Sequence, residues 1–87
     1  MTGRRVYRGA GCNLLYWLFQ PGDYGQTMEE TWYARCPVES SELTANLKGH
    51  NVVEHPDGTI TVSPSIKVTG YDGEWHGYLE RGVWRIA

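Results

Sequence analysis

Residues 56–68 have the sequence PDGTITVSPSIKV, and the expected fold follows from this stretch. Its first three residues predict a hairpin turn, because proline presets the first turn position and glycine adopts the left-handed conformation that closes the turn. From residue 59 onward, apolar residues alternate with hydroxyl-bearing or charged ones, a period of two that is typical of a strand with one buried face. Pro64 cannot donate a hydrogen bond to a sheet, so we expect the strand 59–68 to lie at a sheet edge or to bend near its middle.

The segments on both sides of this stretch continue the pattern of strands and short turns. Residues 51–55 should pair with the start of the following strand across the turn. Near the C-terminus, residues 74–79 and 83–86 flank a Glu-Arg-Gly sequence, which predicts a hairpin with a three-residue loop and a positive φ at Gly82. The apolar side chains expected to cover this second hairpin are Trp75, Tyr78, Trp84 and Ile86.

The N-terminal part of the chain has a less regular pattern. Residues 4–8 alternate around a central valine and predict a first strand. Residues 14–19 form an apolar run, and its two apolar faces predict a central strand that is covered on both sides. Residues 20–25 have the composition of a loop.

Two segments in the middle of the chain complete the expected order of elements. In residues 27–36 mostly apolar residues alternate with mostly polar ones, which predicts a long third strand. Met28 would face inward, and Glu30 would be the one charged residue among the inward positions. Residues 41–47 allow either one or two helical turns capped by Ser41 or a strand, of which we favour the strand. The apolar residues of that strand would be Leu43, Ala45 and Leu47.

Length and composition fit one small domain. The chain has 87 residues, among them eleven glycines, four tryptophans and six tyrosines, and single domains run from about 50 to 250 residues. Consecutive antiparallel strands joined by short turns give a meander, a small sandwich or a partly open barrel. We therefore expect residues 1–87 to form a single domain that is all-β, or nearly all-β with one short helix.

Charge and hydropathy argue against several classes of function. The net charge is −2, whereas nucleic-acid-binding domains are usually basic, so we do not expect nucleic acid as a partner. No apolar run reaches the ~18 residues that span a bilayer, so we expect no membrane partner and a cytoplasmic location. Arg4, Arg5 and Arg8 form a basic cluster, which we interpret as part of a solvated N-terminal strand that frays and not as a binding site.

The cysteines and histidines do not have the spacing of a metal site. Cys12 and Cys36 are the two cysteines, which a reducing compartment keeps as thiols, although one bridge between them stays open. Structural zinc needs about four cysteine and histidine ligands, and Cys36 has no partner two to four residues away. We expect no cofactor; if zinc were bound, Cys36 and His76 would be its ligands.

Three segments of the C-terminal half form a specific combination: Ser63-Pro64-Ser65-Ile66, Trp75-His76-Gly77-Tyr78-Leu79 and Arg81-Gly82-Val83-Trp84. This combination resembles a small uncharacterised domain family found mainly in bacteriophages and prophages, and residues 11–15 agree with it more weakly. The resemblance favours a strand at 41–47 and implies a viral accessory role in the host cytoplasm, but it implies no activity.

The resemblance has one departure that concerns metal binding. Relatives often carry a Cys-Pro-x-Cys knuckle and a further cysteine before the Gly-Trp-His-Gly segment. Here Val38 and Glu39 follow Pro37, and Glu74 stands before Trp75. The metal site that the family implies therefore lacks these cysteines.

Residue types suited to catalysis are present without the expected surroundings. Ser63 or Ser65, His76 and Asp72 could supply a nucleophile, a base and an acid. No strained turn of the Gly-x-Ser-x-Gly kind surrounds either serine. We therefore predict that the protein is not an enzyme and has no catalytic residue.

Aromatic residues are the remaining resource for function. The chain has more tryptophan and tyrosine rings than a core of this size can bury, so we expect several of them at the surface. Exposed tyrosine and tryptophan beside arginine are typical of binding hot spots. The predicted aromatic and basic binding surface consists of Tyr33, Arg35, Trp75, His76, Tyr78 and Trp84.

Together these features predict a small phage-type accessory protein that binds and modulates a host protein through an aromatic surface, without catalysis. Two alternatives stay open. One is sequestration of a nucleotide or another small metabolite in a pocket of aromatic and arginine side chains. The other is self-association into a homo-oligomer through unprotected strand edges.

Overall fold

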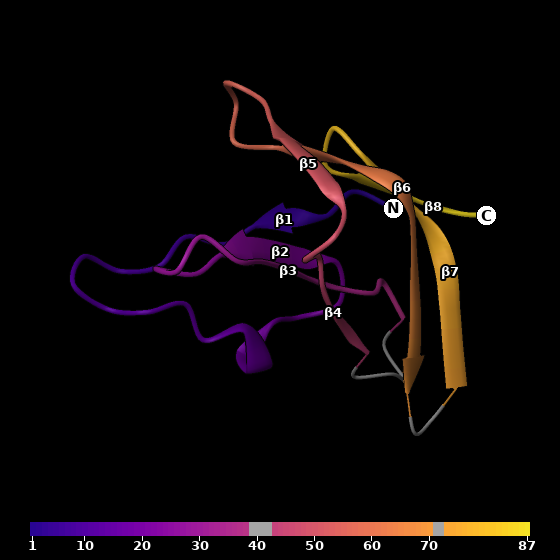
Figure 1. Ribbon diagram of the computed structural model, residues 1–87, viewed down its shortest axis with the longest axis horizontal. Helices are drawn as coiled ribbons and strands as arrows, with labels where there is room; N and C mark the ends of the chain where they lie inside the picture. Colours follow the sequence, from indigo (N-terminus) through magenta and orange to yellow (C-terminus); the bar gives the residue numbers. More distant parts are fainter. Residues whose placement is uncertain (39–42, 71–72) are drawn as a thin grey trace.

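The computed structural model describes residues 1–38, 43–70 and 73–87. Its regular secondary structure consists of β-strands and one 3-10 turn, so the fold is nearly all-β, as the sequence predicts (Figure 1). An N-terminal sheet has the strand order β1-β2-β3-β4 and a C-terminal sheet the order β5-β6-β7-β8, and the two do not close into a barrel. The elements are β1 (Arg4–Arg5), η1 (Tyr16–Leu18), β2 (Asp23–Gln26), β3 (Trp32–Arg35), β4 (Thr44–Asn46), β5 (Asn51–Glu54), β6 (Ile60–Gly70), β7 (Gly73–Glu80) and β8 (Val83–Ile86).

The first residues of the chain belong to both sheets. The N–H of Gly3 donates to the carbonyl of Gly82 at 2.7 Å, and Thr2 forms a bridge with Val83 at the start of β8. The next two residues form β1, which pairs in parallel with β2. In Figure 1 the N-terminus accordingly lies beside β8 before the chain enters β1.

A strand forms where the sequence predicts the first one, but β1 covers only Arg4–Arg5, and ion pairs hold both of its arginines instead of leaving the strand frayed. Arg4 Nη2 lies 2.9 Å from Oδ2 of Asp23, and Arg5 Nη1 lies 2.6 Å from Oε2 of Glu54 on β5. The second pair joins an edge strand of one sheet to an edge strand of the other. The Arg5 guanidinium also lies over two aromatic rings, those of Tyr7 and Trp32.

The hairpin at 56–58 forms as its sequence predicts. β5 pairs with β6 in antiparallel register. The N–H of His55 donates to the carbonyl of Thr59 at 2.8 Å, and the N–H of Gly58 donates back to the carbonyl of His55 at 2.9 Å. Gly58 has a φ of +89°, which is the geometry of a three-residue hairpin loop closed by a left-handed glycine.

The strand that follows bends at its proline and also becomes an edge strand there, so both predicted possibilities are present. β6 lies between β5 and β7 up to Ser63, but among the described strands its residues beyond Pro64 pair with β7 alone. Its register with β7 shifts between Val62 and Ile66, on either side of the exposed Pro64. The ladder is interrupted where proline has no N–H to donate.

The C-terminal hairpin has a shorter loop than predicted. Glu80 pairs directly with Val83, which leaves a two-residue loop rather than three residues. Arg81 and Gly82 both have positive φ, +46° and +75°, as a type I′ turn requires. The positive φ at Gly82 is confirmed, but Ile86, expected to cover the hairpin, is 77% exposed.

The segment 14–19 is not the buried central strand that its apolar run predicts. Leu14 and Phe19 are buried, but the residues between them form the single 3-10 turn η1. A side chain at Gly25 on β2 would meet Leu14, so the segment lies across the outer face of the N-terminal sheet instead of pairing within it. Three of its large side chains are exposed: Leu15, Trp17 and Leu18.

The predicted long strand 27–36 is instead the loop of the β2–β3 hairpin followed by β3, and part of the predicted loop 20–25 is the strand β2. The N–H of Thr27 donates to the carbonyl of Thr31 at 2.9 Å, and the N–H of Glu30 donates to the carbonyl of Thr27 at 3.0 Å. Glu30 has a φ of +64°, so this loop repeats the geometry of 56–58 without a glycine. Met28, expected inward, is exposed.

The strand expected within 41–47 is confirmed for β4; Ser41 lies outside the described residues. The two sheets pack their inner faces around a shared apolar core. The buried residues of this core are Tyr24, Ala34, Cys36, Leu43, Ala45, Leu47, Ile60, Val62, Ile66, Trp75, Leu79 and Trp84.

Candidate functional site

The six residues of the predicted binding surface lie in three separate places, and two of them are in the core. Trp75 and Trp84 are 7% and 3% exposed, and their rings meet edge to face with centroids 5.3 Å apart. Trp84 Nε1 donates to the carbonyl of Gly22 at 2.9 Å. Both rings are on the inward faces of β7 and β8, beside the buried Leu79, so they cannot contribute to a surface.

His76 and Tyr78 lie on β7, on the face turned away from the core. His76 is exposed, and its Nε2 lies 2.8 Å from Oγ of Ser65 on β6. The Arg85 guanidinium lies 4.7 Å from the ring centre of the half-buried Tyr78. The serine and histidine form a cross-strand hydrogen bond in open solvent, and Asp72, the expected third member, lies outside the described residues.

Tyr33 and Arg35 lie on the outer face of β3, where they meet residues that the sequence did not single out. The ring of Tyr16 stacks on Tyr33 with centroids 3.8 Å apart and planes 2° from parallel. Trp17 meets Tyr16 edge to face at 5.1 Å. Tyr16, Trp17, Arg35 and Thr44 line a hollow of about 260 Å³. We call the following residues the aromatic patch: Leu15, Tyr16, Trp17, Leu18 and Tyr33.

The loop that carries most of the patch is fixed at both ends. At its start, Oδ1 of Asn13 accepts hydrogen bonds from the backbone N–H of Leu14 at 2.8 Å and of Met28 at 3.0 Å. At its end, the Arg35 side chain donates to the carbonyl of Phe19. The side chains of Leu14 and Phe19 are also buried. The loop is therefore held in place at both ends while its middle residues lie at the surface.

The exposed part of the patch is large, apolar and uncharged. Trp17 and Leu18 are both 64% exposed. Partial burial, together with the contact to Tyr16, raises the pKa of Tyr33 above its ordinary value, so the phenol stays neutral up to a higher pH than an exposed tyrosine does. Sequence reasoning missed residues 15–18 because an unbroken apolar run is usually buried. The adjacent tyrosine and tryptophan were the available signal, since both residue types are enriched in binding hot spots.

The cysteines do not form a metal site in the part of the chain that the structure describes. Cys12 is exposed and Cys36 is buried, and both are free thiols. Burial raises the pKa of Cys36 to about 11, so the thiol is protonated at neutral pH and a metal ion would have to displace that proton in order to bind. Among the described residues, no group of three or more histidine, cysteine, aspartate or glutamate side chains could hold a metal ion.

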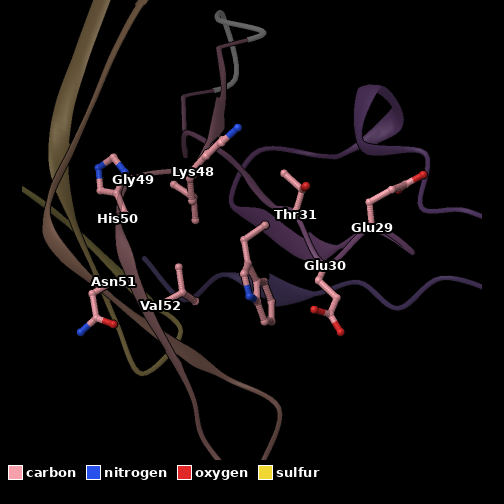
Figure 2. Close-up of a pocket in the computed structure, with 10 residues that line it drawn as sticks. Glu29, Glu30, Thr31, Lys48, Gly49, His50, Asn51 and Val52 are labelled. Atoms are coloured by element: carbon pink, nitrogen blue, oxygen red, sulfur yellow. The ribbon is translucent and has the colours of Figure 1, made fainter.

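A second concave feature lies where β5 faces the turn between β2 and β3. Figure 2 shows this groove, with Glu29, Glu30 and Thr31 along one wall and the residues from Lys48 to Val52 along the other. Its volume is about 600 Å³, and Trp32 and Leu47 complete its lining. Carboxylates therefore lie on one wall and the Lys48 ammonium on the opposite one.

Comparison of this chain with protein-family models, with curated proteins and with solved structures gave no match. The resemblance to a phage family therefore stays a prediction from the sequence motifs. None of the helical residues described here forms a segment with the length and apolar character needed to cross a membrane.

Proposed function

We propose that this protein is a non-catalytic binding domain that engages and modulates a partner protein through the aromatic patch. The observation that carries the proposal is the loop 14–19, which buries its two end residues and leaves Leu15, Trp17 and Leu18 in solvent. Large apolar side chains that gather at one exposed place often mark a site of protein interaction.

Two properties of the patch support protein binding. Tryptophan and tyrosine are among the residue types most enriched in hot spots. The rings of Tyr16 and Tyr33 are already stacked, so they lose little conformational freedom when a partner covers them. Arg35 lies beside the rings and can offer a polar contact at the rim of the hollow. A host protein as the partner, and the host cytoplasm as the location, are proposals that rest on the phage resemblance.

The two alternative functions have less support. Small-ligand sites usually have volumes of about 300–1,000 Å³, whereas the hollow lined by Tyr16, Trp17, Arg35 and Thr44 has a volume of about 260 Å³. We therefore rank sequestration of a metabolite second. Self-association through unprotected strand edges is a further proposal, which light scattering at two protein concentrations tests directly.

The experiment is capture of partners from host lysate by the wild-type protein and two variants. Trp17→Ser removes the most prominent ring of the patch, and Ile86→Ser is the matched control, because Ile86 is an exposed apolar residue on β8. A partner identified in this way is then purified and titrated against each variant by calorimetry. We expect Trp17→Ser to weaken binding by about 2 kcal/mol or more, as hot-spot truncations do, and Ile86→Ser to leave it unchanged.

Binding that persists at wild-type strength in Trp17→Ser and in a Tyr33→Ala variant would contradict the proposal. A partner lost in Ile86→Ser alone would place the binding surface on the C-terminal sheet instead. Circular dichroism of each variant establishes that the fold is retained.

A further inference from the structure

β5 is an edge strand whose outer side has no neighbouring strand among the described residues. The N–H of His55 donates to Thr59, and in an antiparallel ladder every second residue points its N–H and C=O toward the partner strand. Asn51, Val53 and His55 therefore bond to β6, whereas Val52 and Glu54 point their backbone groups away from it. β5 thus offers donors and acceptors in the spacing that another strand requires.

The groove of Figure 2 adjoins this free backbone. Asn51 and Val52 of β5 form part of its lining, and Trp32 and Leu47 add further apolar side chains to it. An added strand lies about 4.8 Å from the strand it pairs with, and the groove of about 600 Å³ offers room there for a short extended segment. The turn between β2 and β3 forms the opposite wall.

The charges of the groove complement a segment with residues of both signs. Glu30 and Lys48 lie on opposite walls. Within residues 1–38, 43–70 and 73–87, neither side chain takes part in an ion pair. Glu54, which is also close to this edge, is already paired with Arg5.

We infer that the groove beside β5 binds an extended peptide segment of a partner protein by strand addition. The backbone of the segment pairs with Val52 and Glu54, one of its apolar side chains contacts Trp32, and basic and acidic residues of the segment face Glu30 and Lys48. This site is separate from the aromatic patch, because Trp32 packs toward the core while Tyr33 lies on the other face of β3. The domain would then hold two partners, or two parts of one.

The experiment selects binders from a phage-displayed library of random short peptides on the immobilised full-length protein. The best synthetic peptide is then titrated by fluorescence polarisation against three variants. Val52→Pro removes one outward N–H without touching the ladder to β6, Val52→Thr is the matched control that keeps this N–H, and Trp17→Ser alters only the aromatic patch. We expect Val52→Pro to weaken binding more than tenfold and the other two variants to bind as wild type does.

Hydrogen exchange of the wild-type protein gives a second measurement that does not depend on any variant folding. Peptide should slow exchange at the amides of Val52 and Glu54, while the amide of Val53, already bonded to β6, changes less. The inference is wrong if no library peptide binds, if binding survives in Val52→Pro with these amides unprotected, or if a second copy of the chain protects them without peptide. If peptide binding is lost only in Trp17→Ser, the peptide binds at the aromatic patch and the proposed site in the groove is wrong.

Discussion

Two groups of aromatic rings in this protein have opposite surroundings. Trp75 and Trp84 meet edge to face on the inner side of the C-terminal sheet and are almost fully buried. Tyr16 and Tyr33 stack on the outer side of the N-terminal sheet, with Trp17 exposed beside them. The residue types are nearly the same, yet the first group can act only on stability and the second is available for binding.

The buried pair also explains part of the Trp-His-Gly motif without reference to function. Trp75 and Gly77 lie on the same face of β7, and the indole of Trp75 occupies the space that a side chain at position 77 would need. Gly77 therefore makes room for the ring, as glycine often does where a neighbour approaches the backbone closely. The exposed patch has no comparable structural role, so changes there test function instead of folding.

The largest expected effect is the loss of a buried ring. Trp84→Ala should destabilise the protein by about 3–5 kcal/mol, because it leaves a cavity between the sheets, and it also removes the hydrogen bond to Gly22. Chemical denaturation followed by circular dichroism measures this. Trp84→Phe keeps most of the apolar volume and should cost clearly less; equal stability of wild type and Trp84→Ala would contradict the assignment of this ring to the core.

A smaller effect is expected from filling the space next to the buried pair. In Gly77→Ala the new methyl group would collide with the Trp75 ring and with the carbonyl of Arg85. We expect a loss of about 1–3 kcal/mol, the usual cost of overpacking. Gly9→Ala is the control, since a methyl group there has its nearest neighbour at 3.8 Å; if both variants melt alike, the close packing of Trp75 on Gly77 is refuted.

The two cysteines extend the contrast between buried and exposed groups to pH dependence. Burial raises the pKa of Cys36 from 9.0 to about 11. Above pH 9 the unfolded chain ionises this thiol before the folded one does, so stability should fall as the pH rises from about 9 to about 11. At neutral pH a thiol reagent should label the exposed Cys12 at once and Cys36 only after unfolding. A Cys36→Ala variant serves as the control; if its stability has the same pH dependence in this range, another group is responsible.

The smallest expected effect on stability is at the exposed patch. Trp17→Ser should change the free energy of unfolding by no more than about 0.5 kcal/mol, as surface substitutions usually do. The same variant should lose most of the fluorescence that iodide quenches in wild type, because Trp17 is the most exposed tryptophan. A loss of stability comparable to that of Trp84→Ala would show that the ring is part of the packing.

The two three-residue hairpin loops show why some strand boundaries could be predicted from the sequence and others could not. Residues 56–58 contain proline and glycine at the positions where the backbone demands them, so the turn is visible in the sequence. The loop between β2 and β3 has the same hydrogen bonds and a positive φ, but Glu30 stands where glycine would be expected. Nothing in the local sequence indicates that turn, and alternation alone extended one strand through it.

The candidate site was predicted in part for a related reason. Tyr33 and Arg35 lie on the patch as expected, while the partner ring of Tyr33 comes from a segment that we assigned to a buried strand. Trp75 and Trp84 were expected at the surface because aromatic residues seemed too numerous for the core. In the structure the inner faces of both sheets absorb them, and the exposed rings are those of η1.

The sequence by itself determined the β class, the hairpin at 56–58, an edge position or a bend of the strand at Pro64, and the positive φ of Gly82. These features depend on the backbone preferences of a few neighbouring residues and on the alternation of apolar and polar residues among them. They therefore do not require contacts with distant parts of the chain. Only the tertiary structure decided which aromatic rings are buried, that residues 14–19 lie across a sheet, and that β5 keeps a free edge beside a groove. Each of these depends on contacts between residues far apart in the chain, because burial is a property of the face that another element covers and not of the residue alone.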